Sequence, residues 1–524
     1  MKKTEKLKNI EFLRFIFVLI LIYGHLFLIT SLLPNIPLYH YNATHYRKAA
    51  LVVDFFFILS GFFFKYTINT ELDIFDFLKK KFTRLWAVVA FAVIGYWSME
   101  MFNITSYDAN IYDGIFSFFL MDNIGITLHH CGPSWYVSVL VLVSLFYFCM
   151  YKVLGEKITN LIIGILVWFS YTFTINTDFG AISQTIMVQN NFICMGLLRG
   201  IGGIGIGVFL HYAYDKYKDS MTYNNKLFYT LAECGLLGWC VYAMISSTER
   251  IHNSMICVMA FAVLILLFLI KKGYLSQITD NNLSVVLGKY TYSVFLTHII
   301  IIFLLSGTIW NHSNTFIQEY PSLTLGLIYL MAFVAGFITY HTIEKPDNKL
   351  FKKLGFMRYY LAVFTMILTI SGTGSYFYTH RPIKADKIYS FNKIHHNIKT
   401  AGISGLEQWG RWSDGKEVIL SFYSPLKNDN IVKFNVIPFL NETIRERKIE
   451  IYSDTKLLAV WTYVLGENAP QTIVNVPKEC IKKNGKVRLT FNISDPISPK
   501  ELGESNDSRK LGIGFVDMKI SEAK

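Results

Sequence analysis

Eleven apolar stretches, each long enough to cross a lipid bilayer, follow one another through the first 378 residues of this chain. A helix needs roughly 20 mostly apolar residues to span the hydrocarbon core, where only helices and closed barrels satisfy their backbone hydrogen bonds. The first stretch is too long for a cleavable signal peptide and lacks a small-residue cleavage site, so we expect it to remain as a span. The sequence therefore predicts a polytopic α-helical membrane bundle. The stretches lie near 10–33, 48–66, 84–102, 134–154, 157–175, 193–213, 227–246, 254–270, 290–309, 323–342 and 359–378.

Positive charge is distributed unevenly over the predicted loops. With the N-terminus inside, the cytoplasmic segments hold 22 Lys and Arg residues, whereas the opposite segments hold only Arg47, Lys48 and Arg250. Cytoplasmic loops carry an excess of Lys and Arg, so the N-terminus is predicted inside and the C-terminal region outside. The formal net charge of +13 then reflects loops that face anionic lipid. The lipid bilayer, and not nucleic acid, is the expected partner of this charge.

The composition changes after the eleventh stretch. Residues 386–524 are polar, with short alternating runs such as VRLTFNI separated by turn-forming residues, a pattern typical of an all-β sandwich. We therefore predict three parts: a ten-span membrane domain over 1–350, an eleventh span with a linker over 351–385, and an extracytoplasmic β-sandwich over 386–524. Cys480 is the only cysteine of the last part, so no internal disulfide is expected there.

Two ionisable residues, Arg14 and His25, lie inside the first apolar stretch. Such side chains are costly at membrane depth and usually mark a pathway or a reaction site. At 100° per residue they fall on one face of a helix, roughly 16 Å apart along its axis. One face therefore combines a fixed cation with a titratable imidazole, and both residues are candidate catalytic residues.

Asp54, near the outer end of the second stretch, is the third candidate catalytic residue. The second span runs from outside to inside, so Asp54 and His25 are both expected in the outer half of the bilayer. A carboxylate bonded to one imidazole nitrogen fixes the tautomer and leaves the other nitrogen as a base. A structural pairing of Asp54 with another group of the bundle explains the residue equally well.

Further polar residues gather at the ends of the predicted spans. Lys81 and Arg84, three residues apart, lie on one side of the third helix and could hold phosphates, although positive-inside topology explains their neighbours. Trp135 precedes the fourth span, after two histidines at 129 and 130, and is either an interfacial belt residue or part of a site rim. The ninth span carries Tyr292, Ser293 and His298, and the tenth ends at Glu344. The sequence contains no metal-binding signature.

The predicted β region contains the stretch GISGLEQWGRWSDG over residues 402–415. Trp409 and Trp412 could stack on a sugar while Glu407 and Arg411 bond its hydroxyls. Alternatively, the two tryptophans are core residues and Glu407 forms an internal ion pair with Arg411. We favour this second interpretation slightly.

Taken together, these motifs resemble membrane acyltransferase family 3 over about residues 8–350. The resemblance rests on the spacing of Arg14 and His25 and on VDFFFILSGFF, KKKFTRLW, PSWYVSVLVLV, GKYTYSVFLTHIII and TIEKP, in the family's order. It implies a ten-span core that transfers an acyl group, usually acetyl from cytoplasmic acetyl-CoA, to a sugar hydroxyl beyond the membrane. Two positions depart from the family pattern: Lys81 replaces an arginine, and Trp86 replaces a common proline.

The resemblance also implies roles for individual residues. His25 is the essential imidazole, which either removes a proton from the acceptor hydroxyl or carries the acyl group briefly itself, and Arg14 is its basic companion. The donor acetyl-CoA is expected to bind Arg84, Lys81, Tyr292 and Ser293. The acceptor is expected to contact Trp135, His298, Glu344, Trp409 and Arg411. No metal is expected.

The expected location is the bacterial cytoplasmic (inner) membrane, and the expected acceptor is an extracytoplasmic glycan such as lipopolysaccharide O-antigen, capsule, exopolysaccharide or wall glycan. The C-terminal part is too short for an esterase-like Ser-His-Asp domain and looks like β-sandwich domains attached to other membrane glycan enzymes. A transporter or flippase for a lipid-linked sugar is the alternative function, because buried ionisable residues suit it too. Such proteins often contain internal repeats and paired broken helices, which the sequence does not show.

Overall fold

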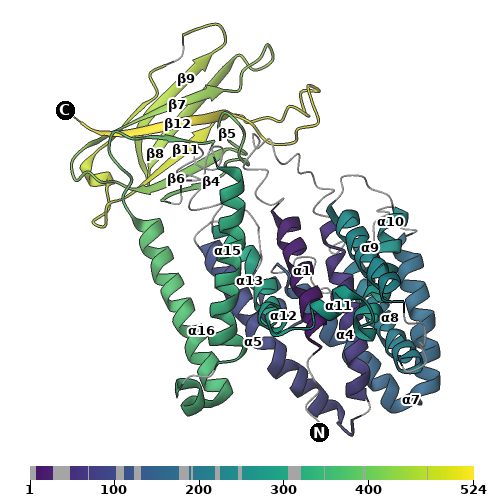
Figure 1. Cartoon of the computed structure of the whole chain (residues 1–524). Helices are drawn as coiled ribbons and strands as arrows, with labels where there is room; N and C mark the ends of the chain where they lie inside the picture. The colour runs from purple at the N-terminus through teal and green to yellow at the C-terminus, as the bar shows by residue number, and fades with distance from the viewer. Residues whose placement is uncertain are drawn as a thin grey trace. The chain divides into compact units, whose positions relative to one another are not determined.

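The computed structural model of the chain divides into two compact units, residues 1–368 and residues 369–524. The first is helical and the second is formed mainly by two β-sheets (Figure 1). The structure describes residues 7–26, 48–68, 70–101, 111–122, 132–175, 188–189, 193–218, 225–245, 251–304, 320–346, 349–392, 395, 397–468 and 470–523.

Each of the eleven predicted spans coincides with a helix of the structure. Five described helices are long and apolar enough to cross a membrane, or six if the bent pair α12 and α13 forms one span. A polytopic helical membrane bundle is thus supported, while the number of eleven spans is not confirmed. The elements are α1 (Lys8–His25), α4 (Val52–Ile68), α5 (Ile74–Met101), α6 (Ile111–Phe118), α7 (Ser134–Ile175), β1 (Val188–Gln189), β2 (Ile193–Cys194), α8 (Met195–Tyr217), α9 (Lys226–Ile245), α10 (Ile251–Ile270), α11 (Tyr274–Ile278), α12 (Asn282–Gly288), α13 (Thr291–Leu304), α15 (Pro321–Thr339), the π-helical turn η2 (Tyr340–Glu344) and α16 (Lys349–His380).

The element α7 contains two of the predicted spans, joined at Gly155. This glycine adopts φ 75° and ψ 174°, a conformation that is unfavourable for other residues. The Tyr151 hydroxyl donates to the Asn160 side chain at 2.5 Å across the break. The two halves therefore lie side by side as a helical hairpin.

Helices α4 and α8 approach each other closely through glycines. A Cβ atom at Gly61 would lie 2.1 Å from the carbonyl oxygen of Ile204, and one at Gly207 would lie 2.1 Å from that of Ile58. Small residues at such contacts let helix backbones meet in membrane proteins. The glycine-rich run of α8 is therefore a packing surface, as its sequence indicates.

Helix α16 packs on α5 through Trp86. The Trp86 ring lies 6.2, 6.1 and 5.8 Å from the rings of Phe356, Tyr360 and Phe364, between centroids. Its indole N–H also donates to the Phe118 carbonyl at 3.0 Å. Trp86, which departs from the family pattern, thus forms the surface on which the additional helix packs.

Two tyrosines of α16 also bond the turn η2. The Tyr359 hydroxyl donates to the Thr342 carbonyl at 3.0 Å, and the Tyr360 hydroxyl donates to the Ile343 carbonyl at 2.5 Å. A π-helical turn leaves carbonyls without their usual helical partners, so these bonds satisfy its end. The next residue along the turn is Glu344.

We expect Trp86→Ala to destabilise the helical unit by about 3–5 kcal/mol, because it removes a fully packed aromatic side chain. Thermal unfolding of the purified protein measures the effect. Trp168, which is 66% exposed, provides a matched control. If Trp168→Ala lowers the unfolding temperature as much as Trp86→Ala does, the assigned role of Trp86 is wrong.

The second unit is an antiparallel β-sandwich, as its alternating sequence predicts. Its two sheets face each other through aromatic side chains: Phe491 lies 5.3 Å from Phe434 and 5.2 Å from Phe515, between ring centroids. One sheet has the order β10 (Ile473–Val476), β7 (Asn430–Pro438), β12 (Ile513–Glu522), β3 (Ile388–Ser390), and β5 (Arg411–Trp412) pairs with β12. The other has the order β4 (Ile398–Ala401), β6 (Glu417–Tyr423), β11 (Lys486–Ile493), β8 (Glu446–Ser453), β9 (Lys456–Val464).

Candidate functional site

Two histidines from distant parts of the chain meet inside the helical bundle. Nε2 of His298 lies 3.3 Å from Nδ1 of His25, and the two rings are inclined by 72°. Nδ1 of His298 lies 3.1 Å from the Val294 carbonyl, and Nδ1 of His25 lies 2.9 Å from the Leu21 carbonyl. His298, which the sequence suggested as an acceptor-binding residue, is therefore the neighbour of the predicted catalytic imidazole.

These contacts assign the tautomers of both rings. A carbonyl oxygen only accepts hydrogen bonds, so each Nδ1 carries the proton when its ring is neutral. The lone pair on Nε2 of His298 then faces the Nδ1–H group of His25. The lone pair of neutral His25 resides on Nε2, which is the nitrogen that can act as a base.

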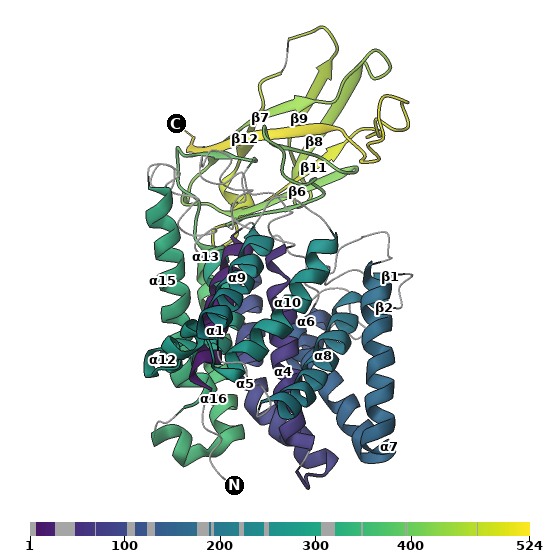
Figure 2. The same ribbon diagram turned by 45° about the vertical axis from the view of Figure 1, so that its right-hand side comes forward.

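The bent pair α12 and α13 places His298. The two helices meet at 42°, and α12 lies beside α1 in both views (Figures 1 and 2). The Thr291 hydroxyl donates to the Gly288 carbonyl at 2.7 Å at the bend. A Cβ atom at Gly288 would lie 2.4 Å from a carboxylate oxygen of Glu11, so the end of α12 touches α1 directly. Glu11 in turn forms an ion pair with Arg14 at 2.9 Å.

A second polar cluster surrounds Glu344. The Ser293 hydroxyl donates to Glu344 at 2.7 Å, and the positive charges of Arg14 and Arg84 both attract this carboxylate. The Tyr292 hydroxyl donates to the carbonyl of Leu85 at 2.8 Å, next to the exposed Arg84. Ser293 and Glu344, both predicted site residues, are therefore in direct contact, and the charges of Arg14 and Arg84 act on the same carboxylate.

Lys81 contacts helix α7. Its ammonium group is 3.5 Å from the Ser144 hydroxyl and 5.7 Å from the centre of the Phe77 ring. Tyr136, which follows Trp135, has its ring 5.2 Å from that of Phe295 on α13 and its hydroxyl 3.4 Å from that of Ser60.

Of the two interpretations of Asp54, partnership with His25 or a structural pairing, the structure shows a structural pairing. Asp54 forms a 2.7 Å ion pair with Arg199 of α8, and both side chains are fully buried. Arg199 also donates to the Ala50 carbonyl at 2.7 Å. A buried charge is tolerated when paired, and Arg199 lies on the helix that packs most closely against α4. Asp54 thus joins helices and is not part of the histidine site.

Trp135 is also placed differently from its predicted role at a site rim. It is 6% exposed, and its ring lies 5.7 Å from the Arg199 guanidinium and 6.3 Å from the Phe57 ring. A cation over an indole face is a favourable contact, which helps to cover the buried arginine. The histidines at 129 and 130 lie outside the described residues.

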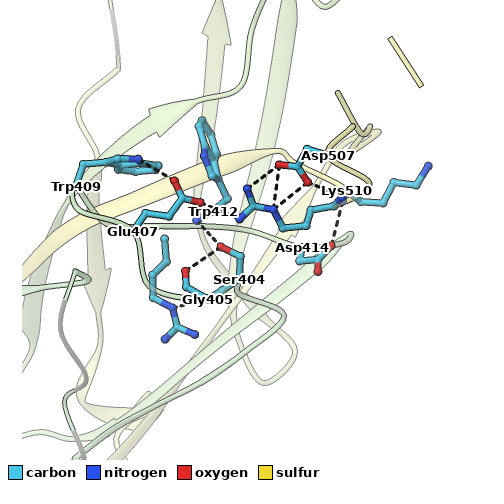
Figure 3. Close-up of polar contacts among 10 residues, drawn as sticks. Ser404, Gly405, Glu407, Trp409, Trp412, Asp414, Asp507 and Lys510 are labelled. Atoms are coloured by element: carbon cyan, nitrogen blue, oxygen red, sulfur yellow. Dashed lines mark hydrogen bonds and ion pairs between the residues drawn. The ribbon is translucent and has the colours of Figure 1, made fainter. Parts of the chain in front are cut away.

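In the β-sandwich, the expected ion pair between Glu407 and Arg411 does not form. Glu407 pairs with Arg509 at 2.8 Å and accepts a hydrogen bond from the Trp409 indole at 3.1 Å (Figure 3). Arg411 donates to the Ser404 carbonyl at 2.5 Å, and its partial burial lowers the pKa of its guanidinium. Arg509 replaces Arg411 as the cation beside the tryptophan.

The fold and the site define a membrane protein with a buried pair of imidazoles and a separate cluster of charged residues, which includes Arg84 and Glu344. The family model described as an acyltransferase domain (Acyl_transf_3) matches residues 7–342, and a domain of unknown function (DUF7024) matches residues 382–522. The chain belongs to membrane acyltransferase family 3. No curated protein and no solved structure matches it.

Proposed function

We propose that this protein is an O-acetyltransferase of the bacterial inner membrane. It would transfer an acetyl group from cytoplasmic acetyl-CoA to a hydroxyl of a surface polysaccharide or lipid-linked glycan outside the cytoplasm. The observation that carries the proposal is the buried pair of His25 and His298, in which the Leu21 carbonyl holds the proton on Nδ1 of His25 and leaves the lone pair on Nε2. Family membership supports acyl transfer as the reaction.

The cluster around Glu344 supports a donor site. Phosphates of the donor would bind Arg84 and Arg14, with Lys81 nearby, and would compete with the Glu344 carboxylate for these cations. Tyr292 and Ser293 lie on the same helix as His298, α13. The acyl arm would have to cover roughly 16 Å, the rise of α1 between Arg14 and His25, to bring the thioester to the imidazole.

In the direct route, Nε2 of His25 removes the proton of the acceptor hydroxyl while the oxygen attacks the thioester carbonyl carbon. The carbon–sulfur bond then breaks, and the imidazolium returns the proton to the departing sulfur. His298 accepts from Nδ1–H of His25 and favours the positive charge that develops on this ring. In the alternative route Nε2 attacks the carbonyl first, the carbon–sulfur bond breaks and the thiolate leaves. The acceptor oxygen then takes the acetyl group from Nε2, and the hydroxyl proton neutralises the thiolate.

One observation favours a transporter, namely the break between α12 and α13, since broken helices line the binding sites of many transporters. Incubation of the purified protein with radiolabelled acetyl-CoA and a glycan acceptor separates the two functions. The enzyme consumes thioester and labels the glycan. A transporter leaves the thioester intact, and that result would refute the proposal.

Arg84→Ala should raise the KM for acetyl-CoA by about tenfold with little change in kcat, because it removes one charged contact of about 1.4 kcal/mol. The exposed Lys79, on the same helix, is the matched control. Steady-state kinetics over a donor series measures both. Equal KM values for Arg84→Ala and Lys79→Ala would show that Arg84 does not hold the donor.

A further inference from the structure

A rigid loop of the β-sandwich presents aromatic and charged side chains side by side. Residues 402–410 connect β4 to β5, which pairs with β12. Figure 3 shows Ser404, Glu407 and Trp409 of this loop. A Cβ atom at Gly410 would lie 2.2 Å from the Phe515 carbonyl oxygen, and one at Gly402, with φ +68°, would lie 2.0 Å from that of Glu417. The loop backbone is therefore pressed against both sheets, so its side chains are held in place before any ligand arrives.

Two indole side chains pack on β12. Trp409 and Trp412 are both partly exposed, with ring centroids 5.1 Å apart and an interplanar angle of 73°. Gly514 makes the room, because a Cβ atom there would lie 2.4 Å from the Trp409 ring. The neighbouring Leu406 is 48% exposed. The surface at this point is thus an ordered aromatic platform.

The polar atom of Trp409 is bound to a charged group. Its indole N–H donates to Glu407, which also pairs with Arg509, and Arg509 bonds Asp507 at 2.6 Å. The side chains of Glu407, Arg509 and Asp507 are 29%, 34% and 26% exposed. Hydrogen bonds from Arg509 lower the pKa of Asp507, and the two carboxylates raise the pKa of Arg509, so both charges persist around neutral pH.

We propose that Trp409, Glu407, Asp507 and Arg509 form a binding site for a neutral pyranose unit of a glycan. The C–H face of a pyranose ring is apolar and matches an indole, while its hydroxyls can donate to the remaining carboxylate lone pairs. Arg509 is already engaged by two carboxylates, so its charge is not available to a uronic acid, whose carboxylate Glu407 and Asp507 would also repel. The site does not depend on acyl transfer in the helical unit.

Saturation-transfer NMR on the full chain in lipid nanodiscs tests the proposal. Glycoside detergents are left out of the preparation, because they would compete for the site. The probes are neutral tetrasaccharides of glucose, mannose, galactose and N-acetylglucosamine, with tetragalacturonate as the charged probe. At least one neutral probe should bind with a Kd of about 1–10 mM and receive saturation at its ring C–H protons. Binding should be independent of pH between about 6 and 8, where both charges persist.

Matched variants separate binding from folding. Trp409→Ala should raise the Kd of the bound probe at least tenfold. Trp409→Phe should raise this Kd much less, and Trp168→Ala should leave it unchanged. Glu407→Gln keeps the acceptor for the indole but loses the ion pair, and should weaken binding severalfold with an unchanged melting temperature. The proposal is overturned if no neutral probe binds, if only tetragalacturonate binds, or if Trp409→Ala or Glu407→Gln binds like the wild type.

Discussion

Acyl transfer is expected to be lost in His25→Ala, with kcat reduced by up to about 10⁴-fold. The variant removes the nitrogen that would take the acceptor proton, and neither route of transfer proceeds without it. Thioester consumption and glycan labelling with radiolabelled acetyl-CoA measure the loss. The protein should still insert and purify normally, because His25 is the last residue of α1 and the apolar face before it is unchanged.

A second histidine provides the control for this experiment. His380, at the end of α16, bonds the Tyr376 carbonyl at 2.8 Å, so His380→Ala also removes a hydrogen-bonded imidazole. It should retain wild-type activity. Retention of wild-type acetylation by His25→Ala itself would defeat the catalytic assignment and the proposed mechanism with it.

The second large effect is expected at His298, which we regard as a positioning residue. His298→Leu should lower kcat by about 100-fold while the KM for acetyl-CoA changes less than threefold, because the variant removes the acceptor facing Nδ1–H of His25. His298→Gln places an oxygen acceptor near the position of Nε2 and should restore part of kcat. A purely structural role predicts that both variants lose activity in parallel with stability.

Thermal unfolding of the two His298 variants completes the test. Comparable melting temperatures with different kcat values would support the positioning role. If His298→Leu instead raises the KM for a defined acceptor and leaves kcat intact, His298 binds the acceptor, as its sequence context first suggested.

Periodicity in the sequence predicted the elements well, because it depends on neighbours along the chain. The spacing of apolar residues located the long helices, and alternation located most strands of the sandwich. The spacing of Arg14 and His25 also placed both on one helix. Periodicity does not show which helix faces pack against each other. The site is formed by residues on different helices, so its contacts could not be predicted in this way.

The misassigned partners show this limit. His25 and His298 are 273 positions apart, and Glu407 and Arg509 are 102 apart, so no local pattern links either pair. Arg199 lies in a glycine-rich run that was interpreted only as a helix-packing surface. A single arginine in an apolar span nevertheless needs a buried counter-ion. That requirement, applied to Asp54, would have suggested the observed pair.

The bonds from Tyr359 and Tyr360 to the turn before Glu344 change where the catalytic part of the chain ends. The family match stops at residue 342, yet the carbonyls of Thr342 and Ile343 are braced by side chains encoded about seventeen positions later. The helix that leads to the β-sandwich thus also supports the turn that ends at Glu344. A chain cut before Gly355 would lose both bonds, whereas exchange of the sandwich beyond residue 385 for another domain would leave them intact.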